Sequence, residues 1–377
     1  MTTIDWTKYP LTQKDWEHFA TLDRIGRRKF LKGGNSEGLI LQYQRNEVPR
    51  CEVCIHAFFN CVCGDPEYAK KRARWQAELS KSFEEKVEHS EELVDFVLEK
   101  ARKYHLKFYL AYSGGIDSEC CLQLFKKGIV EGFITVIVGN TTTELPDTYR
   151  RWKEAEVELG VKFVYALPER EVTFKSNSIK YGLAIYPRNA QSKTSGSEAM
   201  KIPTKRCCGN LKEKPQAKLM KDANGVILGL KATESQGRMF SVKNKGDCFV
   251  DSKGKWNIKP IAYWTTENEW KFQKLRGFKY NIIYDKTNCG KTGFYKLISG
   301  KLYQIRSGCA FCPQGIHSGY LEWLKEYYPK WYKALIKIYN EVAQARGDGI
   351  NFLQVLIIKK KIKLKEQKQQ PCGEPLC

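Results

Sequence analysis

The chain has 377 residues, of which 42% are hydrophobic, enough for one large domain or two smaller ones around a sizeable core. Lysine and arginine number 64 against 42 aspartate and glutamate, which gives a formal net charge of +22 at pH 7. So large an excess favours a polyanionic partner, most often nucleic acid, over a charge that serves solubility alone. There is no run of about 18 apolar residues, and the polar N-terminus lacks the apolar core of a signal peptide, so we expect a cytoplasmic protein with no membrane span.

Residues 1–85 are polar and charged and contain one dense group of cysteines, CEVCIHAFFNCVCG. The chain has 14 cysteines, which in a reducing cytosol favour metal, cluster or redox chemistry over structural disulfides. The C-x-x-C spacing is common in zinc knuckles, and zinc would stabilise a segment too poor in apolar residues to fold alone. We therefore predict a structural zinc site, with a second iron–sulfur cluster or free thiols as the alternatives. Its ligands would be Cys51, Cys54, Cys61 and Cys63.

From about residue 107 to residue 284, apolar strand-like runs alternate with helix-like stretches. A helical stretch at about 80–104 leads into this region, and further helices are expected at about 119–127 and 146–159. Such alternation predicts an α/β fold with a mostly parallel sheet flanked by helices. We expect this domain to span residues 86–317, with strands at 108–112, 133–139, 162–167 and 225–230.

The C-terminal region, residues 318–377, combines a predicted helical part with a basic tail. Aromatic and aliphatic residues recur at helical spacing from Tyr320 to Ile338, and Pro329 should start or interrupt a helix there. The lysine-rich run KKKIKLKEQK is either a solvated terminus or an arm that follows phosphates.

A glycine-containing loop, SGGIDS at residues 113–118, follows the first predicted strand and opens a helix. Glycine permits positive φ and leaves room for a ligand, so successive backbone N–H groups can point at an anion. The start of the following helix adds a partly positive end. The loop is neither a Walker A motif nor a dinucleotide fingerprint, because GK[ST] and G-x-G-x-x-G are both absent. Two glycines alone would favour an ordinary strand–helix turn.

The complete SGGIDS string resembles the SGGxDS loop of the PP-loop ATP pyrophosphatase superfamily, whose domain is adenine nucleotide alpha hydrolase-like. The resemblance implies that the loop holds the pyrophosphate part of ATP together with Mg²⁺. It also implies cleavage between the α- and β-phosphates, adenylation of a substrate oxygen, and catalytic roles for Ser113 and Asp117. The residues that it assigns to nucleotide binding are Tyr112, Ser113, Gly114, Gly115, Ile116, Asp117 and Ser118.

Three further segments resemble the phosphoadenosine phosphosulfate (PAPS) reductase family of that superfamily. They are GNTTTELPDTY (139–149), GLKATESQGRM (229–239) and KPIAYWTTENEW (259–270), and the resemblance covers about residues 107–317. Lys231 and Arg238 are the phosphate binders that it implies, because ammonium and guanidinium groups pair with phosphate. The residues that would complete the nucleotide pocket are Asn140, Thr141, Thr142, Gly229, Lys231 and Arg238.

Two pairs of cysteines, in KRCCGNLKEKP and RSGCAFCPQG, resemble the [4Fe–4S] motif of adenylylsulfate reductases. Four thiolates are the ligand count that such a cluster needs, and zinc is its main competitor. Simple burial as small apolar side chains is disfavoured, since both pairs lie among lysine, arginine, glycine and proline. The cluster ligands implied by the resemblance are Cys207, Cys208, Cys309 and Cys312.

The intact loop argues for ATP itself as the substrate, because sulfonucleotide reductases usually carry a degenerate loop. In chemistry the chain is more similar to the DndC-like subunits of DNA phosphorothioation, with cluster-dependent tRNA thiolases as a parallel. The favoured hypothesis is therefore an adenylating, pyrophosphate-releasing sulfur-transfer enzyme that uses a [4Fe–4S] cluster and modifies nucleic acid. Its expected partners are DNA or RNA and a sulfur donor such as cysteine desulfurase, or a reductant. We expect a homo-oligomer or one subunit of a complex.

Two alternatives stay open. A sulfonucleotide reductase would release sulfite and use Cys372 or Cys377, in the C-terminal QPCGEPLC, as the attacking thiolate, with Cys372 as the catalytic candidate. A non-enzymatic nucleic-acid-binding protein on the same fold would show salt-sensitive binding without turnover.

Overall fold

The computed structural model describes residues 66–185 and 203–368. The chain divides into two compact units, Met1–Ser80 and Lys81–Cys377. The described part of the first unit is helix α3 (Pro66–Ser80). The predicted zinc ligands Cys51, Cys54, Cys61 and Cys63, together with Cys372 and Cys377, lie outside the described residues.

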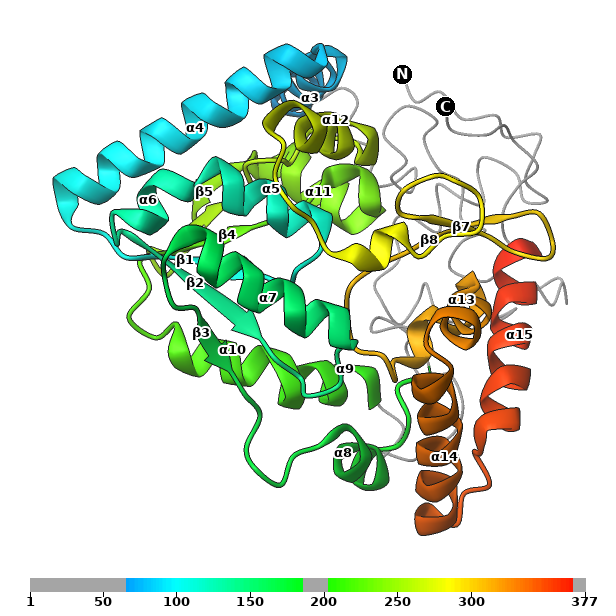
Figure 1. The fold of residues 1–377 in the computed structure, drawn as a ribbon. Coiled ribbons are helices and arrows are strands. Elements are labelled where there is room, and N and C mark those ends of the chain that lie inside the picture. The colour runs from blue at the N-terminus through cyan, green and yellow to red at the C-terminus, as the bar shows by residue number, and fades with distance from the viewer. Residues whose placement is uncertain (1–65, 186–202, 369–377) are drawn as a thin grey trace, which may run out of the picture. The chain divides into compact units, whose positions relative to one another are not determined.

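A six-stranded sheet forms the centre of the second unit, in the order β3-β2-β1-β4-β6-β5 (Figure 1). All neighbouring strands are parallel except β5 and β6. The predicted α/β fold with a mostly parallel sheet is thus confirmed, and the four predicted strands are β1 to β4. The strands are β1 (Phe108–Tyr112), β2 (Ile134–Gly139), β3 (Val164–Ala166), β4 (Gly225–Leu228), β5 (Cys248–Val250) and β6 (Trp256–Ile258).

Helices flank the sheet (Figure 1). The predicted helix at 146–159 is confirmed as α7 (Pro146–Leu159), which begins with proline and ends at Gly160, where φ is +67°. The helix expected at 119–127 begins earlier and is divided into α5 (Ile116–Leu124) and α6 (Lys126–Val130). The other helices of this part are α4 (Phe83–Tyr104), α8 (Phe174–Tyr181), α9 (Pro203–Cys208), α10 (Lys214–Leu219), α11 (Gln236–Lys245) and α12 (Thr266–Arg276).

A capping box explains why α4 begins at Phe83 rather than at residue 80. Ser82 Oγ accepts a hydrogen bond from Glu85 N at 3.1 Å, and Ser82 N donates to Glu85 Oε2 at 2.6 Å. These two bonds satisfy donors that a helix start leaves unpaired, so they separate α3 from α4.

The last part of the second unit contains a hairpin and three helices. The hairpin pairs β7 (Phe294–Lys296) with β8 (Leu302–Gln304) in antiparallel register. Of the two outcomes expected for Pro329, the structure shows the start of a helix, because this residue occupies the first turn of α14, where its missing N–H costs nothing. The lysine-rich segment forms the second half of α15. The helices are α13 (Tyr320–Tyr327), α14 (Pro329–Arg346) and α15 (Phe352–Lys368).

A buried ion pair fixes the elements around the end of β1. Arg151 of α7 places Nε 2.7 Å from Glu119 Oε1 of α5, and its Nη1 lies 2.9 Å from Glu158 Oε1. Tyr112 Oη, at the end of β1, donates to Glu119 Oε1 at 2.5 Å. Because a buried charged network is costly to break, it fixes the position from which the SGGIDS loop leaves the sheet.

Within residues 66–185 and 203–368, no helix is both long enough and apolar enough to cross a membrane.

Candidate nucleotide-binding site

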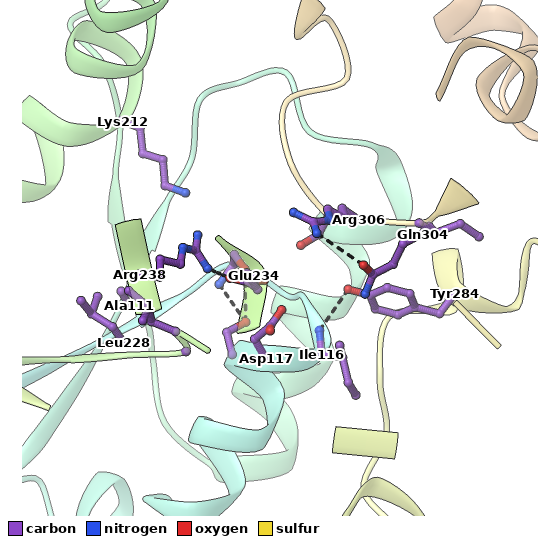
Figure 2. A pocket seen from close by; sticks show the side chains of 16 residues that line it. Ala111, Ile116, Asp117, Lys212, Leu228, Glu234, Arg238, Tyr284, Gln304 and Arg306 are labelled. Carbon is purple, nitrogen blue, oxygen red and sulfur yellow. Dashed lines mark hydrogen bonds and ion pairs between the residues drawn. The ribbon is translucent and has the colours of Figure 1, made fainter. Parts of the chain in front are cut away.

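A cavity of about 340 Å³ opens at the carboxyl ends of β1 and β4. In the sheet, β1 has β2 as its neighbour on one side and β4 on the other. The strand order therefore reverses at β1, next to the cavity. Ligands of open parallel sheets bind at such a crevice. Its lining is Ala111, Ser113, Ile116, Asp117, Ser118, Lys212, Leu228, Gly229, Leu230, Glu234, Arg238, Tyr284, Gln304, Ile305, Arg306 and Ser307 (Figure 2).

The SGGIDS loop forms the turn between β1 and the start of α5. Gly114 has a φ of +73°, a conformation that favours glycine. A Cβ on Gly115 would lie 2.6 Å from Ser307 Oγ, so a side chain there would collide with the opposite wall of the cavity. Ser118 Oγ accepts from Ser113 N at 3.2 Å and donates to the Gly115 carbonyl at 2.8 Å. One serine hydroxyl therefore shapes the turn itself.

The first turn of α5, from Ile116 to Ser118, lines the cavity. Gly115 is the N-cap and supplies no side-chain cap. The Ile116 N–H donates to Tyr284 Oη at 3.0 Å, so the tyrosine hydroxyl lies at the partly positive helix end (Figure 2). That hydroxyl keeps its own proton to donate, and burial raises its pKa. Helix start, hydroxyl and loop together suit an anion.

Three cationic side chains converge on the cavity from separate segments. Lys212 follows α9, Arg238 belongs to α11, and Arg306 follows β8 (Figure 2). Arg238 forms an ion pair with Glu234. Burial lowers the pKa of Arg238; of the nearby charges, Asp117 acts to raise that pKa and Arg306 acts to lower it. An anionic ligand would relieve this repulsion between like charges, so the electrostatics favour a phosphate-bearing molecule.

Asp117 lines the cavity and is tied from behind to Lys231. Lys231 Nζ lies 2.6 Å from Asp117 Oδ1 and also pairs with the Glu269 carboxylate of α12. Although burial acts to raise it, the Lys231 ammonium lowers the pKa of Asp117. Burial and the charge of Asp117 raise the pKa of Glu269. One ammonium thus lies between two carboxyl groups whose pKa values are shifted in opposite directions, that of Asp117 downwards and that of Glu269 upwards.

The predicted nucleotide-binding residues do not all reach this cavity. The structure brings together the six loop residues from Ser113 to Ser118, Gly229 and Arg238, although Gly114 and Gly115 are not among the lining residues. Lys231 is only 2% exposed and supports Asp117 instead of lining the cavity. Tyr112 is buried and bonded to Glu119.

Residues 140–144 lie against the cysteine loop. Thr141 Oγ1 is 3.1 Å from Cys309 Sγ, and the Ala310 N–H donates to the Thr143 carbonyl at 2.7 Å. Thr142 has a φ of +66°, and its N–H donates to Asn140 Oδ1 at 2.8 Å. Of the three residues predicted here for nucleotide binding, Thr141 therefore contacts Cys309, while Asn140 and Thr142 form the adjoining turn, and none of the three lines the cavity.

The four predicted cluster cysteines lie near one another in the fold. Cys207 and Cys208 end α9, and Cys309 and Cys312 lie in the loop that precedes α13. Burial raises the pKa of Cys207, and the other three thiols raise it further. Burial, followed by Cys309, raises the pKa of Cys312 to about 12. The two pairs are therefore close enough to interact electrostatically.

Within the described ranges, no three His, Cys, Asp or Glu side chains are arranged to hold one metal ion. A four-iron cluster makes a different demand, because each thiolate binds its own iron and the four ligands surround the cluster. Four mutually close thiols, one buried and three half-buried, are a donor set that suits such a cluster. Burial raises the pKa of Cys309, and the charge of Lys212, which also lines the nucleotide cavity, acts to lower that pKa.

A second cavity, of about 530 Å³, shares a wall with the first. Cys309 and Cys312 line it, together with Gln304, Arg306 and Ser307, which line the nucleotide cavity as well. Segment 304–307 therefore separates the thiols from the nucleotide cavity.

Several site residues were not predicted from the sequence. Glu269 lies within the quoted segment KPIAYWTTENEW, and its position in that motif could have indicated that it belongs to the site. Arg306 is the first residue of the quoted segment RSGCAFCPQG, so its nearness in sequence to the cysteines was an available signal. Ser307 lies in the quoted segment RSGCAFCPQG, but its place at the SGGIDS loop follows only from the fold. Tyr284 belongs to no quoted segment, and its place at the loop likewise follows only from the fold.

A family model described as the phosphoadenosine phosphosulfate reductase domain matches residues 107–315. No curated protein matches the sequence. Among solved structures, a PAPS reductase from Candida auris in complex with phosphate has 16% identity and a TM-score of 0.38, over 57% of this chain and 89% of that chain.

Two further solved structures are similar. The FMN adenylyltransferase of Candida glabrata in complex with ATP has 10% identity and a TM-score of 0.35, over 60% of this chain and 71% of that chain. An NH3-dependent NAD synthetase from Campylobacter jejuni has 14% identity and a TM-score of 0.31, over 70% of this chain and 96% of that chain.

Proposed function

The chain belongs to the phosphoadenosine phosphosulfate reductase domain family, and from this premise we propose that it is an ATP-dependent, adenylating sulfur-transfer enzyme. The observation that carries the proposal is the intact SGGIDS loop at the carboxyl ends of β1 and β4, with three cations around it. The β- and γ-phosphates of ATP would lie at the first turn of α5. Asp117 is the carboxylate that would hold Mg²⁺, which would supply charge neutralisation between the phosphates.

The proposed first step is an in-line displacement. An oxygen of the acceptor attacks the α-phosphorus, the bond from that phosphorus to the bridging oxygen breaks, and pyrophosphate leaves with the electron pair. Lys212, Arg238 and Arg306 would stabilise the charge that develops on the departing group. In the second step the terminal sulfur of a donor persulfide, such as that of a cysteine desulfurase, attacks the activated carbon or phosphorus and AMP leaves with the electron pair. A second thiol, as the reductant, then attacks the donor sulfur of the new S–S bond, so that the donor leaves as a disulfide and one sulfur stays on the acceptor.

Cys207, Cys208, Cys309 and Cys312 are the residues that would hold a [4Fe–4S] cluster, which when bound would supply sulfur handling or redox chemistry. The shared wall at 304–307 supports the proposal, because it puts the thiols beside the nucleotide cavity. A net charge of +22 supports nucleic acid as the acceptor.

The test uses protein purified without oxygen and incubated with Mg-ATP, with and without DNA or RNA. Pyrophosphate and AMP are measured, and iron, sulfide and zinc are determined on the same sample. We expect pyrophosphate release that rises with nucleic acid and is lost in Asp117→Ala. The matched control is Asp222→Ala, because Asp222 is an exposed partner of Lys107 outside the cavity lining. Nucleic-acid binding without pyrophosphate release would instead indicate a non-enzymatic binding protein.

A sulfonucleotide reductase is the second candidate, and the matched family model favours it. It predicts sulfite release from adenylylsulfate or its 3′-phosphorylated form with no cleavage of ATP. Sulfite release that is lost in Cys372→Ser would replace the first proposal.

A further inference from the structure

The hairpin β7–β8 presents an apolar side chain at the tip of a basic ribbon. Ile298, in the turn, is 96% exposed, which is unusual for an isoleucine. Lys291, Lys296 and Lys301 are exposed on the same hairpin and its approach, and none of them forms an ion pair among the described residues. An exposed apolar tip with cations around it suits a partner that has both phosphates and apolar faces.

The hairpin is held in place by bonds on both of its sides. Asn288 receives a hydrogen bond from Lys296 N at 2.7 Å and donates to the Lys296 carbonyl at 2.8 Å. On the other side, Tyr295 Oη donates to Glu326 Oε2 of α13 at 2.6 Å, and the Ile298 N–H donates to Glu322 Oε2 at 3.4 Å. The tip is therefore ordered before any partner binds, which reduces the entropic cost of association.

Strand β8 leads from the hairpin directly to the nucleotide cavity. Gln304 ends β8 and lines the cavity, and Arg306 and Ser307 follow (Figure 2). A polymer bound along the hairpin would therefore run towards the site where the acceptor must meet ATP. Glu322 and Glu326 are the carboxylates that face the hairpin from α13, and both are bonded to it.

We propose that this hairpin is a nucleic-acid-binding element, in which lysines contact backbone phosphates and Ile298 inserts between neighbouring bases. The inference rests on the proposed function, since it names how the nucleic-acid acceptor is presented. An acceptor atom inside a base stack cannot enter a cavity of about 340 Å³. Enzymes that act on bases unstack them first, and apolar side chains serve as wedges in many nucleic-acid-binding proteins.

The first experiment measures the salt dependence of binding. The full-length protein is titrated into fluorescein-labelled single-stranded DNA, duplex DNA of the same sequence, and the corresponding RNA, over a series of NaCl concentrations. For single strands we expect Lys296→Gln/Lys301→Gln to reduce the slope of log Kd against log [NaCl] by about 1.4 in magnitude, roughly 0.7 per lost phosphate contact. The matched control is Lys126→Gln/Lys127→Gln, which removes two exposed lysines from α6. Equal slopes in the wild type and the hairpin variant, or an equal change in the control, would overturn the proposal.

The second experiment tests the wedge. A 2-aminopurine base in the oligonucleotide becomes brighter when it is unstacked. We expect the wild type and Ile298→Leu to brighten it and Ile298→Ser to fail to do so, at protein concentrations that saturate binding. Because Ile298 is exposed, the serine variant should fold normally, which its unchanged unfolding midpoint would show. Brightening by the serine variant equal to that of the wild type would contradict the wedge.

Measurement of pyrophosphate separates this inference from the proposed function. If both hairpin variants keep full stimulation of pyrophosphate release by nucleic acid, the enzyme proposal stands and the hairpin proposal fails. If no variant, including the wild type, releases pyrophosphate but the salt and fluorescence results are as expected, the binding element stands and the enzyme proposal fails.

Discussion

Lys231 has a supporting role beneath the nucleotide cavity that its place in a phosphate-binding motif does not reveal. It is 2% exposed, and its ammonium lies between Asp117 and Glu269. Removal of one member of a buried charged group leaves the others desolvated without compensation. Lys231 is therefore a positioning residue, because it acts on the ligand through Asp117.

We expect Lys231→Met to lower the free energy of unfolding by roughly 3 kcal/mol, the lower end of the cost of breaking a buried ion pair. Urea denaturation followed by tryptophan fluorescence measures this change. The control is Lys107→Met, since the 3.0 Å pair of Lys107 with Asp222 is exposed on both sides and should contribute little. If the Lys231→Met protein is as stable as the Lys107→Met protein, the buried ion pairs of Lys231 with Asp117 and Glu269 do not stabilise the fold.

At the scale of elements, the site depends on how closely β4 approaches the first turn of α5. A Cβ on Gly229 would lie 2.9 Å from the carbonyl carbon and oxygen of Asp117 and 3.0 Å from Ser118 N. These are backbone atoms, which cannot rotate away as a side chain can. Glycine at this position therefore allows the strand end and the helix start to form one wall of the cavity.

Gly229→Ala should separate these two elements, with a loss of about 1–3 kcal/mol of stability through overpacking and a clear weakening of ATP binding. Thermal unfolding and isothermal titration with Mg-ATP measure the two effects. Gly237→Ala is the matched control in the same sequence segment, because nothing lies within 4 Å of its added Cβ. In helix α11 that change should be neutral or stabilising by up to about 1 kcal/mol. Equal ATP affinities in the two variants would contradict the role given to Gly229.

The elements also explain how much could be predicted from the sequence. Strands β1 to β4 were predictable because each lies in an apolar run that is buried in the sheet, and SGGIDS stood out as a motif between strand and helix. Strand β3 also has three residues, but it lies in the longer apolar run KFVYAL. Strands β5 to β8 have three residues each and are flanked by polar and charged residues, so they give no periodic pattern. Lys231 pairs with Glu269, 38 residues later in the chain, and Tyr284 reaches Ile116 across 168 residues. Such contacts follow only from the packing.

At the scale of the whole second unit, the C-terminal helices hold the cysteine loop in place. Tyr320 Oη donates to the Ala310 carbonyl at 2.9 Å, and Tyr339 Oη donates to the Phe311 carbonyl at 2.8 Å. Lys359 of α15 is 2% exposed, and its charge acts to lower the pKa of Cys312 against the larger effects of burial and Cys309. The last helix thus contributes a buried positive charge beside the proposed cluster ligands.

If these cysteines hold a cluster, its reduction potential should depend on that charge, because a nearby cation stabilises the more negative, reduced form. We expect Lys359→Met to shift the midpoint potential to more negative values, as measured by anaerobic redox titration with electron paramagnetic resonance. Iron content per chain, determined on the same sample, shows whether the cluster is still assembled. Lys360→Met is the matched control, since the neighbouring lysine is exposed and should leave the potential unchanged. An unaltered potential in Lys359→Met with full iron content would show that α15 supports the loop by packing and not by its charge.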